Sequence, residues 1–366
     1  MPPRASAKPD GLVPLFGHSS LKDQLAAAVG RGALPASLLF QGPRGVGKQR
    51  LALWLAQLLL CEKAGKEPCG SCTQCKFTAK LTHPDLHWFF PRPRLKDSDP
   101  SLDDVSADQA EAVAERVETG GLYSAPPGEE AIYVATVRAI VQSAVMSPAI
   151  AKRKVYVIGD AERMVSQTGS DQAANAFLKL LEEPPADTFI ILTSSEPGAL
   201  LPTIRSRVVS LRVTPLTNAE VKDFLAHPSV GAVLKKEHSG MSDSELLSLA
   251  SGAPGRLFGQ DAWEAAATNA RALLDAASSG DDAKMFRAAF VQGTSKARGK
   301  FSDTLDVLTV LLHDRARDEA SVSPRVARGA AVAIEAVERA KELAENNANP
   351  ELVTASLLRE ISPLLS

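Results

Sequence analysis

The feature that most constrains the fold is a glycine-rich segment ending in lysine, Gly42-Pro43-Arg44-Gly45-Val46-Gly47-Lys48. It fits G-x-x-x-x-G-K, in which glycines let backbone N–H groups converge on phosphate oxygens and the lysine reaches the β- and γ-phosphates. An apolar run at 38–40 precedes the segment, and a helical stretch of about 49–60 follows it. This order aims the positive end of the helix at a bound phosphate. The segment therefore predicts an α/β nucleotide-binding domain.

Two later apolar runs, 155–158 and 189–192, predict further strands. Uninterrupted apolar runs of this length fit strands covered on both faces, as in a parallel α/β sheet. After about residue 212 the strand pattern stops, and two segments have the form of capping boxes that open helices, Thr217-x-x-Glu220 and Ser242-x-x-Glu245. We therefore expect three domains: an α/β domain at 1–212, a small helical domain at 213–260 and an all-helical domain at 261–366.

The nucleotide motifs depart from those of a working ATPase at two points. Ser or Thr normally follows the lysine and gives Mg²⁺ a hydroxyl ligand, but here the residue is Gln49. Two adjacent acids are expected after the strand near 155–158, one for Mg²⁺ and one to orient water, but the chain has Gly159-Asp160. In this register the metal-binding acid is missing; shifted by one residue, Asp160 binds metal and the water-orienting acid is missing. Either register argues against working ATP and Mg²⁺ cofactors at this site.

All four cysteines of the chain lie within one short segment, as Cys61, Cys69, Cys72 and Cys75. The spacing C-x₇-C-x₂-C-x₂-C lets four thiolates surround one tetrahedral Zn²⁺. Such clustering is typical of a metal site in a reducing compartment rather than of a disulfide framework. Four sulfur ligands leave no open position for water, so we expect a structural zinc that contributes on the order of 10 kcal/mol to local folding. An iron–sulfur cluster is the other metal interpretation, although its usual spacings differ.

Composition limits the remaining classes. The formal net charge is −2, so the chain has no general basic field for nucleic acid, and any such contact must be local. No apolar run reaches the about 18 residues of a membrane span, and the first residues lack the apolar region of a secretory signal. We expect a cytoplasmic protein that does not enter membranes. Residues 1–11 are predicted as a flexible lead-in, and 91–134, with one helical patch near 107–118, as a surface insertion.

Together, the glycine-rich loop, the incomplete acidic strand and the four cysteines resemble the clamp-loader subunits of the AAA+ ATPase class. The bacterial members are the gamma/tau and delta-prime subunits of DNA polymerase III. The resemblance covers about 12–90 and 135–366. It extends to five further stretches: Ala174-Asn175-Ala176-Phe177-Leu178-Lys179-Leu180-Leu181-Glu182-Glu183-Pro184-Pro185, Thr193-Ser194-Ser195-Glu196-Pro197, Ile204-Arg205-Ser206-Arg207-Val208, Gly252-Ala253-Pro254-Gly255-Arg256 and Asn347-Ala348-Asn349-Pro350-Glu351-Leu352.

The resemblance implies roles for particular residues. Arg207 matches the arginine of the family's Ser-Arg-Cys motif, which reaches into a neighbouring subunit's ATP site as an arginine finger, although Val208 replaces the Cys. Arg205 is the competing arginine if the register slips. Thr193 matches the sensor-1 strand end, and Arg256 matches the sensor-2 arginine. The implied fold is a P-loop AAA+ domain with an inserted four-cysteine zinc module, then a small helical lid domain and an all-α C-terminal collar domain.

The incomplete motifs resemble the delta-prime type more than the gamma/tau motor type, and the chain stops directly after the collar match, where tau-type chains carry further domains. The resemblance then implies a fixed part of a pentameric loader, with gamma/tau and delta subunits, the sliding clamp and primer–template DNA as partners. Two alternatives remain open. One is an active gamma-type ATPase subunit with unusual motifs. The other is a zinc-dependent DNA-binding module, although no basic helix adjoins the cysteines.

Overall fold

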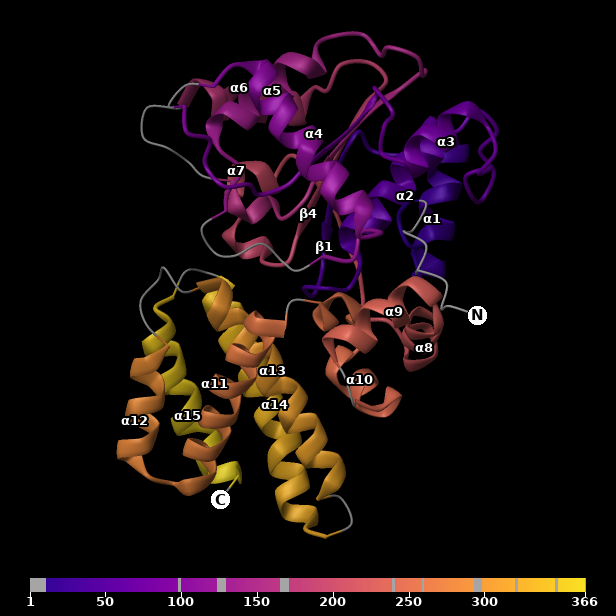
Figure 1. The fold of residues 1–366 in the computed structure, drawn as a ribbon. Helices are drawn as coiled ribbons and strands as arrows, with labels where there is room; N and C mark the ends of the chain where they lie inside the picture. Colours follow the sequence, from indigo (N-terminus) through magenta and orange to yellow (C-terminus); the bar gives the residue numbers. More distant parts are fainter. Residues whose placement is uncertain are drawn as a thin grey trace. The chain divides into compact units, whose positions relative to one another are not determined.

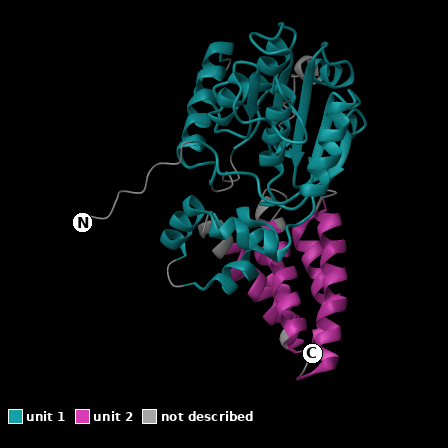
Figure 2. Cartoon of the chain, turned by 90° about the vertical axis from the view of Figure 1, so that its right-hand side faces the viewer, with its two compact units in different colours: residues 1–258 teal, residues 259–366 magenta. Residues whose placement is uncertain are grey.

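The computed structural model describes residues 11–97, 100–123, 130–164, 171–238, 241–258, 260–292, 298–319, 322–345 and 348–365. The predicted lead-in up to residue 10, and Asn347 of the last matching stretch, lie outside this description. The chain forms two compact units, residues 1–258 and 259–366 (Figure 2). Their boundary falls close to the one predicted at 260–261. The helices after residue 213, predicted as a separate domain, group with the α/β part.

The first unit is built on a five-stranded parallel sheet in the order β2-β3-β4-β1-β5. Three of the strands are the ones that the apolar runs predict, so the parallel α/β class is confirmed. The strands are β1 (Ser37–Gln41), β2 (Leu86–Phe89), β3 (Lys154–Ile158), β4 (Thr188–Ser194) and β5 (Val209–Arg212).

Helices cover both faces of the sheet (Figure 1). Successive strand residues point to opposite faces, so Leu38 and Phe40 of β1 pack in one core cluster and Leu39 in the other. The first cluster contains α1 (Ser19–Gly30) and α2 (Lys48–Leu60), and the second contains α5 (Val134–Ala144) and α6 (Asp171–Glu182). Burial on both faces explains why the strands are uninterrupted apolar runs.

The sequence predicts segment 91–134 to be a surface insertion with one helical patch near 107–118. Its helical patch is α4 (Leu102–Glu118), opened by a capping box between Ser101 and Asp104. Most residues of this helix are exposed, but it buries Val105, Ala112 and Arg116 on one side, and Ala112 belongs to the core cluster of α2. Its few hydrophobic residues are separated by Asp, Glu and Ala, so the sequence pattern gives no clear apolar face and does not predict which side of the helix is buried.

A small helical group follows the sheet within the same unit. It contains α8 (Asn218–Ala226), α9 (Pro228–Glu237) and α10 (Asp243–Ala250). Both predicted capping boxes form, with the hydroxyls of Thr217 and Ser242 accepting the backbone N–H three residues on. Its core is joined by Phe16 from the start of the chain, whose ring meets Phe224 edge-on at 5.5 Å. The N-terminal segment thus ties these helices to the sheet.

The second unit is all-helical, as predicted for the C-terminal part. Its core is rich in alanine and leucine, and small side chains let the helices approach closely. At Gly329, an added Cβ would collide with the backbone carbonyl of Leu364. The helices are α11 (Gln260–Ser279), α12 (Asp282–Val291), α13 (Arg298–Asp318), α14 (Pro324–Glu345) and α15 (Pro350–Leu365). None of the described helices is both long and apolar enough to cross a membrane.

A buried carboxylate anchors the chain before β3. Asp85 is 0% exposed and accepts N–H bonds from Ala149, from Ile150 at 2.9 Å and from Ala151 at 2.8 Å. Burial alone would raise the pKa of Asp85, but these three donors hold it below its ordinary value. His83 and Asp85 therefore serve the turn into β2 rather than any metal or acid–base chemistry.

We predict that Asp85→Asn lowers the free energy of unfolding by about 3 kcal/mol at neutral pH, because an amide leaves charge-assisted bonds unmade and turns a donor toward backbone N–H groups. A group with a depressed folded pKa stabilises above its unfolded pKa, and this contribution is lost as pH falls through the folded value. The difference between the two proteins in urea unfolding should therefore shrink toward acid pH. The exposed Asp23→Asn serves as control, and equal effects of both substitutions would refute the anchor.

Candidate functional site

The glycine-rich loop forms between β1 and α2, as the motif requires. Gly45 and Gly47 have φ of 80° and 99°, which only glycine adopts freely. Lys48 is 5% exposed, and its Nζ donates to Gly42 O at 2.8 Å, Pro43 O at 2.9 Å and Ser195 Oγ at 2.8 Å. The loop thus has the phosphate-binding fold, with its lysine turned onto the loop's own carbonyls.

The turn at 252–256 lies directly against the tip of this loop. The N–H of Gly255 donates to Gly45 O at 2.9 Å, and a Cβ added to Gly45 would lie 2.7 Å from the nitrogen of Arg256. The short helix η3 (Pro254–Leu257) continues the turn. The backbone contact between Gly255 and Gly45 therefore places Arg256 next to the phosphate loop.

The amide of Gln49 occupies the side of the loop where a metal ligand is expected. Its Nε2 donates to Asp160 Oδ2 at 3.0 Å. Its Oε1 accepts from Trp88 Nε1 at 3.0 Å and from the Tyr123 hydroxyl at 3.3 Å, and Arg116 NH1 lies 3.5 Å away. The sequence alone gave no role to Trp88, Arg116 or Tyr123, because they lie on β2, on α4 and after α4, and no motif links them.

Gly159 provides the space that this amide fills. A Cβ built on Gly159 would lie 2.5 Å from Oε1 and 2.6 Å from Nε2 of Gln49, too close for any side chain. The two departures from the ATPase pattern therefore contact each other directly. A side chain at 159 would require the Gln49 amide to move out of its hydrogen bonds, and the absence of a side chain at Gly159 leaves room for that amide.

Asp160 is fixed from both sides. Its backbone is left-handed, with φ 48°, and its N–H donates at 3.2 Å to the hydroxyl of Thr193, which is 0% exposed at the end of β4. Glu162 accepts the N–H of Ser195 at 3.0 Å, and burial, reinforced by the charge of Asp160, raises its pKa to about 7. Glu162 was also passed over in the sequence, since it follows the acidic strand outside the motif.

These residues do not fit a magnesium ion. Mg²⁺ requires near-octahedral oxygen ligands at about 2.1 Å. Here a hydroxyl is replaced by an amide that donates to the remaining acid, and the second carboxylate is replaced by Gly159. The space that a metal and its ligands need is filled by the Gln49 side chain.

We predict that Gly159→Ala destabilises the protein by about 2 kcal/mol, because the new Cβ expels the Gln49 amide from its hydrogen bonds. The backbone of Gly159 is not left-handed, so alanine meets no strain of its own. In a Gln49→Ala background the same substitution should cost much less. Urea unfolding of the four proteins measures this coupling, and additive effects would show that the two residues do not depend on each other.

The four cysteines converge as their spacing predicts. Their sulfur atoms all lie within 4.8 Å of one another, and Cys69 Sγ and Cys75 Sγ are 3.9 Å apart. A tetrahedral Zn²⁺ with bonds of about 2.3 Å needs sulfur atoms about 3.8 Å apart. Backbone N–H groups donate to the sulfur atoms. The N–H groups of Cys72 and Ser71 donate to the Cys69 sulfur and lower the pKa of the Cys69 thiol to about 6. The cluster therefore fits one metal ion held for structure.

The loop between Cys61 and Cys69 is tied to the helices of the α/β core. Trp54 of α2 donates its indole N–H to Glu67 Oε2 at 2.6 Å, and Lys22 of α1 pairs with Glu67 at 2.7 Å. On the other side, His83 Nε2 and Gln74 Oε1 are 2.6 Å apart. An ion in the cluster would fix this loop and, through it, the packing of α1 against α2.

We predict one zinc per chain in protein purified without chelator under reducing conditions, and its loss in Cys75→Ser. Removal of zinc should free the 62–68 loop, break the Trp54–Glu67 bond and change tryptophan fluorescence. Metal analysis and emission spectra test this. A Glu67→Gln variant should keep the zinc but lose most of the spectral response, whereas a chain without zinc would refute the site.

Arg207 lies away from the phosphate loop. It directly precedes β5, and the loop follows β1. The two strands are parallel neighbours. Arg207 therefore lies at the amino-terminal ends of the strands, and the loop lies at their carboxyl-terminal ends. Arg207 Nε donates to Glu182 Oε2 at 2.9 Å and NH1 to Thr203 O at 3.0 Å. The guanidinium therefore rests on the surface, beyond reach of its own nucleotide site.

The parallel sheet, the glycine-rich loop and its lysine define a domain with the P-loop fold, carrying a cluster of four cysteines that could hold a metal ion. A family model described as DNA polymerase III, delta subunit, matches residues 17–217, more than half of the chain, and the chain belongs to that family. A relative called DNA polymerase III subunit delta′, from Pseudomonas aeruginosa, is 34% identical over 240 residues, covering 64% of this chain and 59% of the relative.

Relatives called tau or gamma/tau subunits also match. DNA polymerase III subunit tau of Escherichia coli is 26% identical over 253 residues, covering 68% of this chain and 32% of the relative. A solved structure of a DNA polymerase III gamma subunit-related protein from Thermotoga maritima covers 94% of this chain and 100% of its own, at 19% identity and a TM-score of 0.36, too low for any conclusion. The chain spans less than two thirds of the length of the delta′ relatives it matches.

Proposed function

We propose that this chain is a delta-prime-type subunit of the DNA polymerase III clamp loader, which helps place the sliding clamp on primed DNA. Family membership and the delta′ and tau relatives support this role. Its partners are then gamma/tau and delta subunits, the clamp and, through the assembly, primer–template DNA, in the cytoplasm. The five C-terminal helices serve as the collar that joins the subunits, and helices α8 to α10 serve as the lid.

The chain's own site is silent in this proposal, and the Gln49 amide is the observation that carries it. Hydrolysis of ATP by P-loop enzymes needs Mg²⁺ to bridge the β- and γ-phosphates and neutralise developing charge. Gln49 blocks the position next to Gly159 and uses the remaining acid, Asp160, as a hydrogen-bond acceptor. The loop's fold is retained because Lys48 and Gly255 hold it without phosphate.

Arg207 is the residue that acts on a neighbour. Arg207 lies at the end of the strands opposite to its own phosphate loop, and this position suits a group that serves another subunit's nucleotide. The side chains of Arg207 and Glu182 are 30% and 58% exposed, and such surface pairs contribute at most about 1 kcal/mol. A phosphate oxygen, which a guanidinium can bind with two parallel bonds, easily replaces that partner.

The test is ATP turnover by gamma/tau motor subunits reconstituted with delta, clamp, primed DNA and this chain. We predict that Arg207→Ala lowers turnover at the adjoining motor site by about 10³-fold or more. The exposed neighbour Arg205→Ala is the matched control, and Lys48→Ala should leave turnover unchanged. The other motor sites keep their activity, so the total ATP turnover falls only by the contribution of the adjoining site. Single-turnover measurements are therefore needed to measure the fold-change at that site.

The pattern of damage separates the candidates. Loss with Arg207→Ala but not with Arg205→Ala or Lys48→Ala supports a silent subunit that acts on its neighbour. Loss with Lys48→Ala, or ATP hydrolysis by the isolated chain, would establish the gamma-type motor instead. Equal loss with both arginine variants would point to a general effect on the surface of helix α7 (Pro202–Arg205).

A further inference from the structure

A buried arginine from α4 stands beside the blocked metal position. Arg116 is 8% exposed, and its guanidinium carbon lies 3.2 Å from the ring centre of Phe90, 3.8 Å from that of Tyr123 and 4.8 Å from that of Trp88. Aromatic faces attract cations, and the attraction grows when water is excluded. Burial lowers the pKa of Arg116, yet arginine stays charged in proteins. The site therefore holds a fixed internal cation.

The Gln49 amide lies between this cation and the remaining acid. Its nitrogen end donates to Asp160, and its oxygen end faces Arg116, Trp88 and Tyr123, which are all donors. An amide dipole is positive at nitrogen and negative at oxygen, so the carboxylate and the guanidinium each meet the end they favour. Asp160 thus has a positive charge nearby, as an acid at a metal site ordinarily has.

Hydrogen bonds hold helix α4, which carries Arg116, to β2 and to the segment before α1. Gln109 Nε2 of α4 donates to Trp88 O at 2.7 Å, and Gly120 O, just beyond the helix, accepts from Val13 N at 2.7 Å. Arg116 O itself accepts from Gly121 N at 2.7 Å. These contacts hold the backbone of α4 next to β2, at the place from which the Arg116 side chain reaches its three aromatic rings.

We propose that the Arg116 guanidinium takes the electrostatic place of the divalent cation at this phosphate loop. The inference deepens the silent-site part of the proposed function and rests on it. A nearby fixed positive charge repels Mg²⁺ more strongly in a buried setting than in water. Restoring the two lost ligands alone should then not restore metal binding, because the cation is still in place.

The test uses Tb³⁺ as the probe, a hard ion whose emission is excited by nearby tryptophan, here Trp88. Gln49→Thr/Gly159→Asp returns the hydroxyl and the carboxylate and removes the clash at 159. With Arg116 intact, this variant should bind Tb³⁺ no better than the natural chain. Adding Arg116→Met should tighten binding by more than about tenfold, and Mg²⁺ should compete with it.

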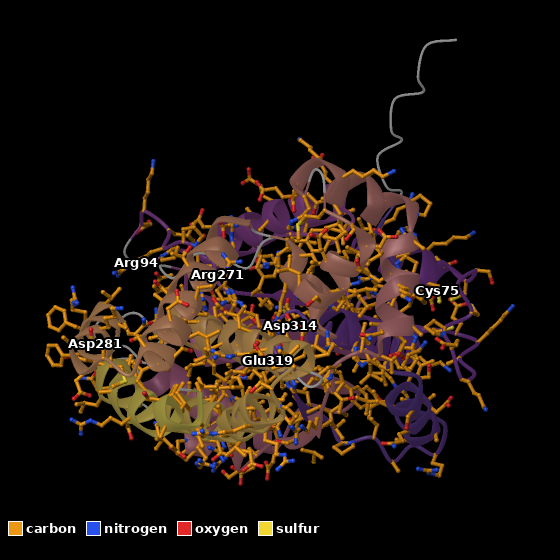
Figure 3. The ribbon with its side chains drawn as sticks, turned by 90° about the horizontal axis from the view of Figure 1, so that it is seen from below. Cys75, Arg94, Arg271, Asp281, Asp314 and Glu319 are labelled. Atoms are coloured by element: carbon orange, nitrogen blue, oxygen red, sulfur yellow. The ribbon has the colours of Figure 1, made fainter. Side chains whose placement is uncertain are left out.

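Two controls separate charge from packing. Arg116→Lys in the same background keeps the positive charge and should not gain binding. Arg94→Met removes an exposed arginine from the loop before α4 (Figure 3) and should have no effect. The zinc cluster, with soft thiolate ligands, does not compete for a hard ion; Figure 3 labels one of its cysteines, Cys75.

The outcomes are decisive even if Arg116→Met does not fold. Tight Tb³⁺ binding by Gln49→Thr/Gly159→Asp with Arg116 present would overturn the proposal by itself. Equal gains with Met and Lys at position 116 would also overturn it, since packing and not charge would be responsible. Neither result touches the turnover test of Arg207, so failure of this inference and failure of the proposed function remain distinguishable.

Discussion

The Gln49 side chain is the contact on which the organisation of the nucleotide site depends. Its amide joins α2 to β2 through Trp88, to the end of β3 through Asp160, and to the segment after α4 through Tyr123. It does so because Gly159 leaves the space open. In a working ATPase a metal ion bound with nucleotide joins such elements for part of each cycle. Here a neutral side chain joins them.

The phosphate loop also makes several contacts with the rest of the chain. Lys48 bonds to loop carbonyls and to Ser195, and Gly255 bonds to Gly45. Contacts that a nucleotide would mediate are therefore made by the chain itself. The cysteine cluster adds a second fixed point on the other side of α2, where Trp54 and Glu67 connect the metal loop to the helix. A domain tied in this way suits a part whose shape does not follow ATP binding.

The placement of Arg207 follows from the geometry of a parallel sheet. In a parallel sheet, the segments before the strands and the segments after them lie at opposite ends of the strands. A residue that precedes β5 is therefore far from a loop that follows β1. One domain therefore presents two different surfaces, an internal phosphate loop and an external arginine. A change at the phosphate loop therefore places no restriction on the arginine, and this separation is what the proposed silent subunit requires.

The sequence by itself determined three of the five strands, the capping boxes, the phosphate loop and the cysteine cluster, because each depends on residues close together in the chain. It also showed that Gln49 and Gly159 break the ATPase pattern. Only the tertiary structure showed that these two residues fill one space, and that Arg116 and Tyr123 join them. Those contacts link positions 49, 116, 123 and 159. Their pairing depends on how α4 packs against β2, which no local spacing encodes.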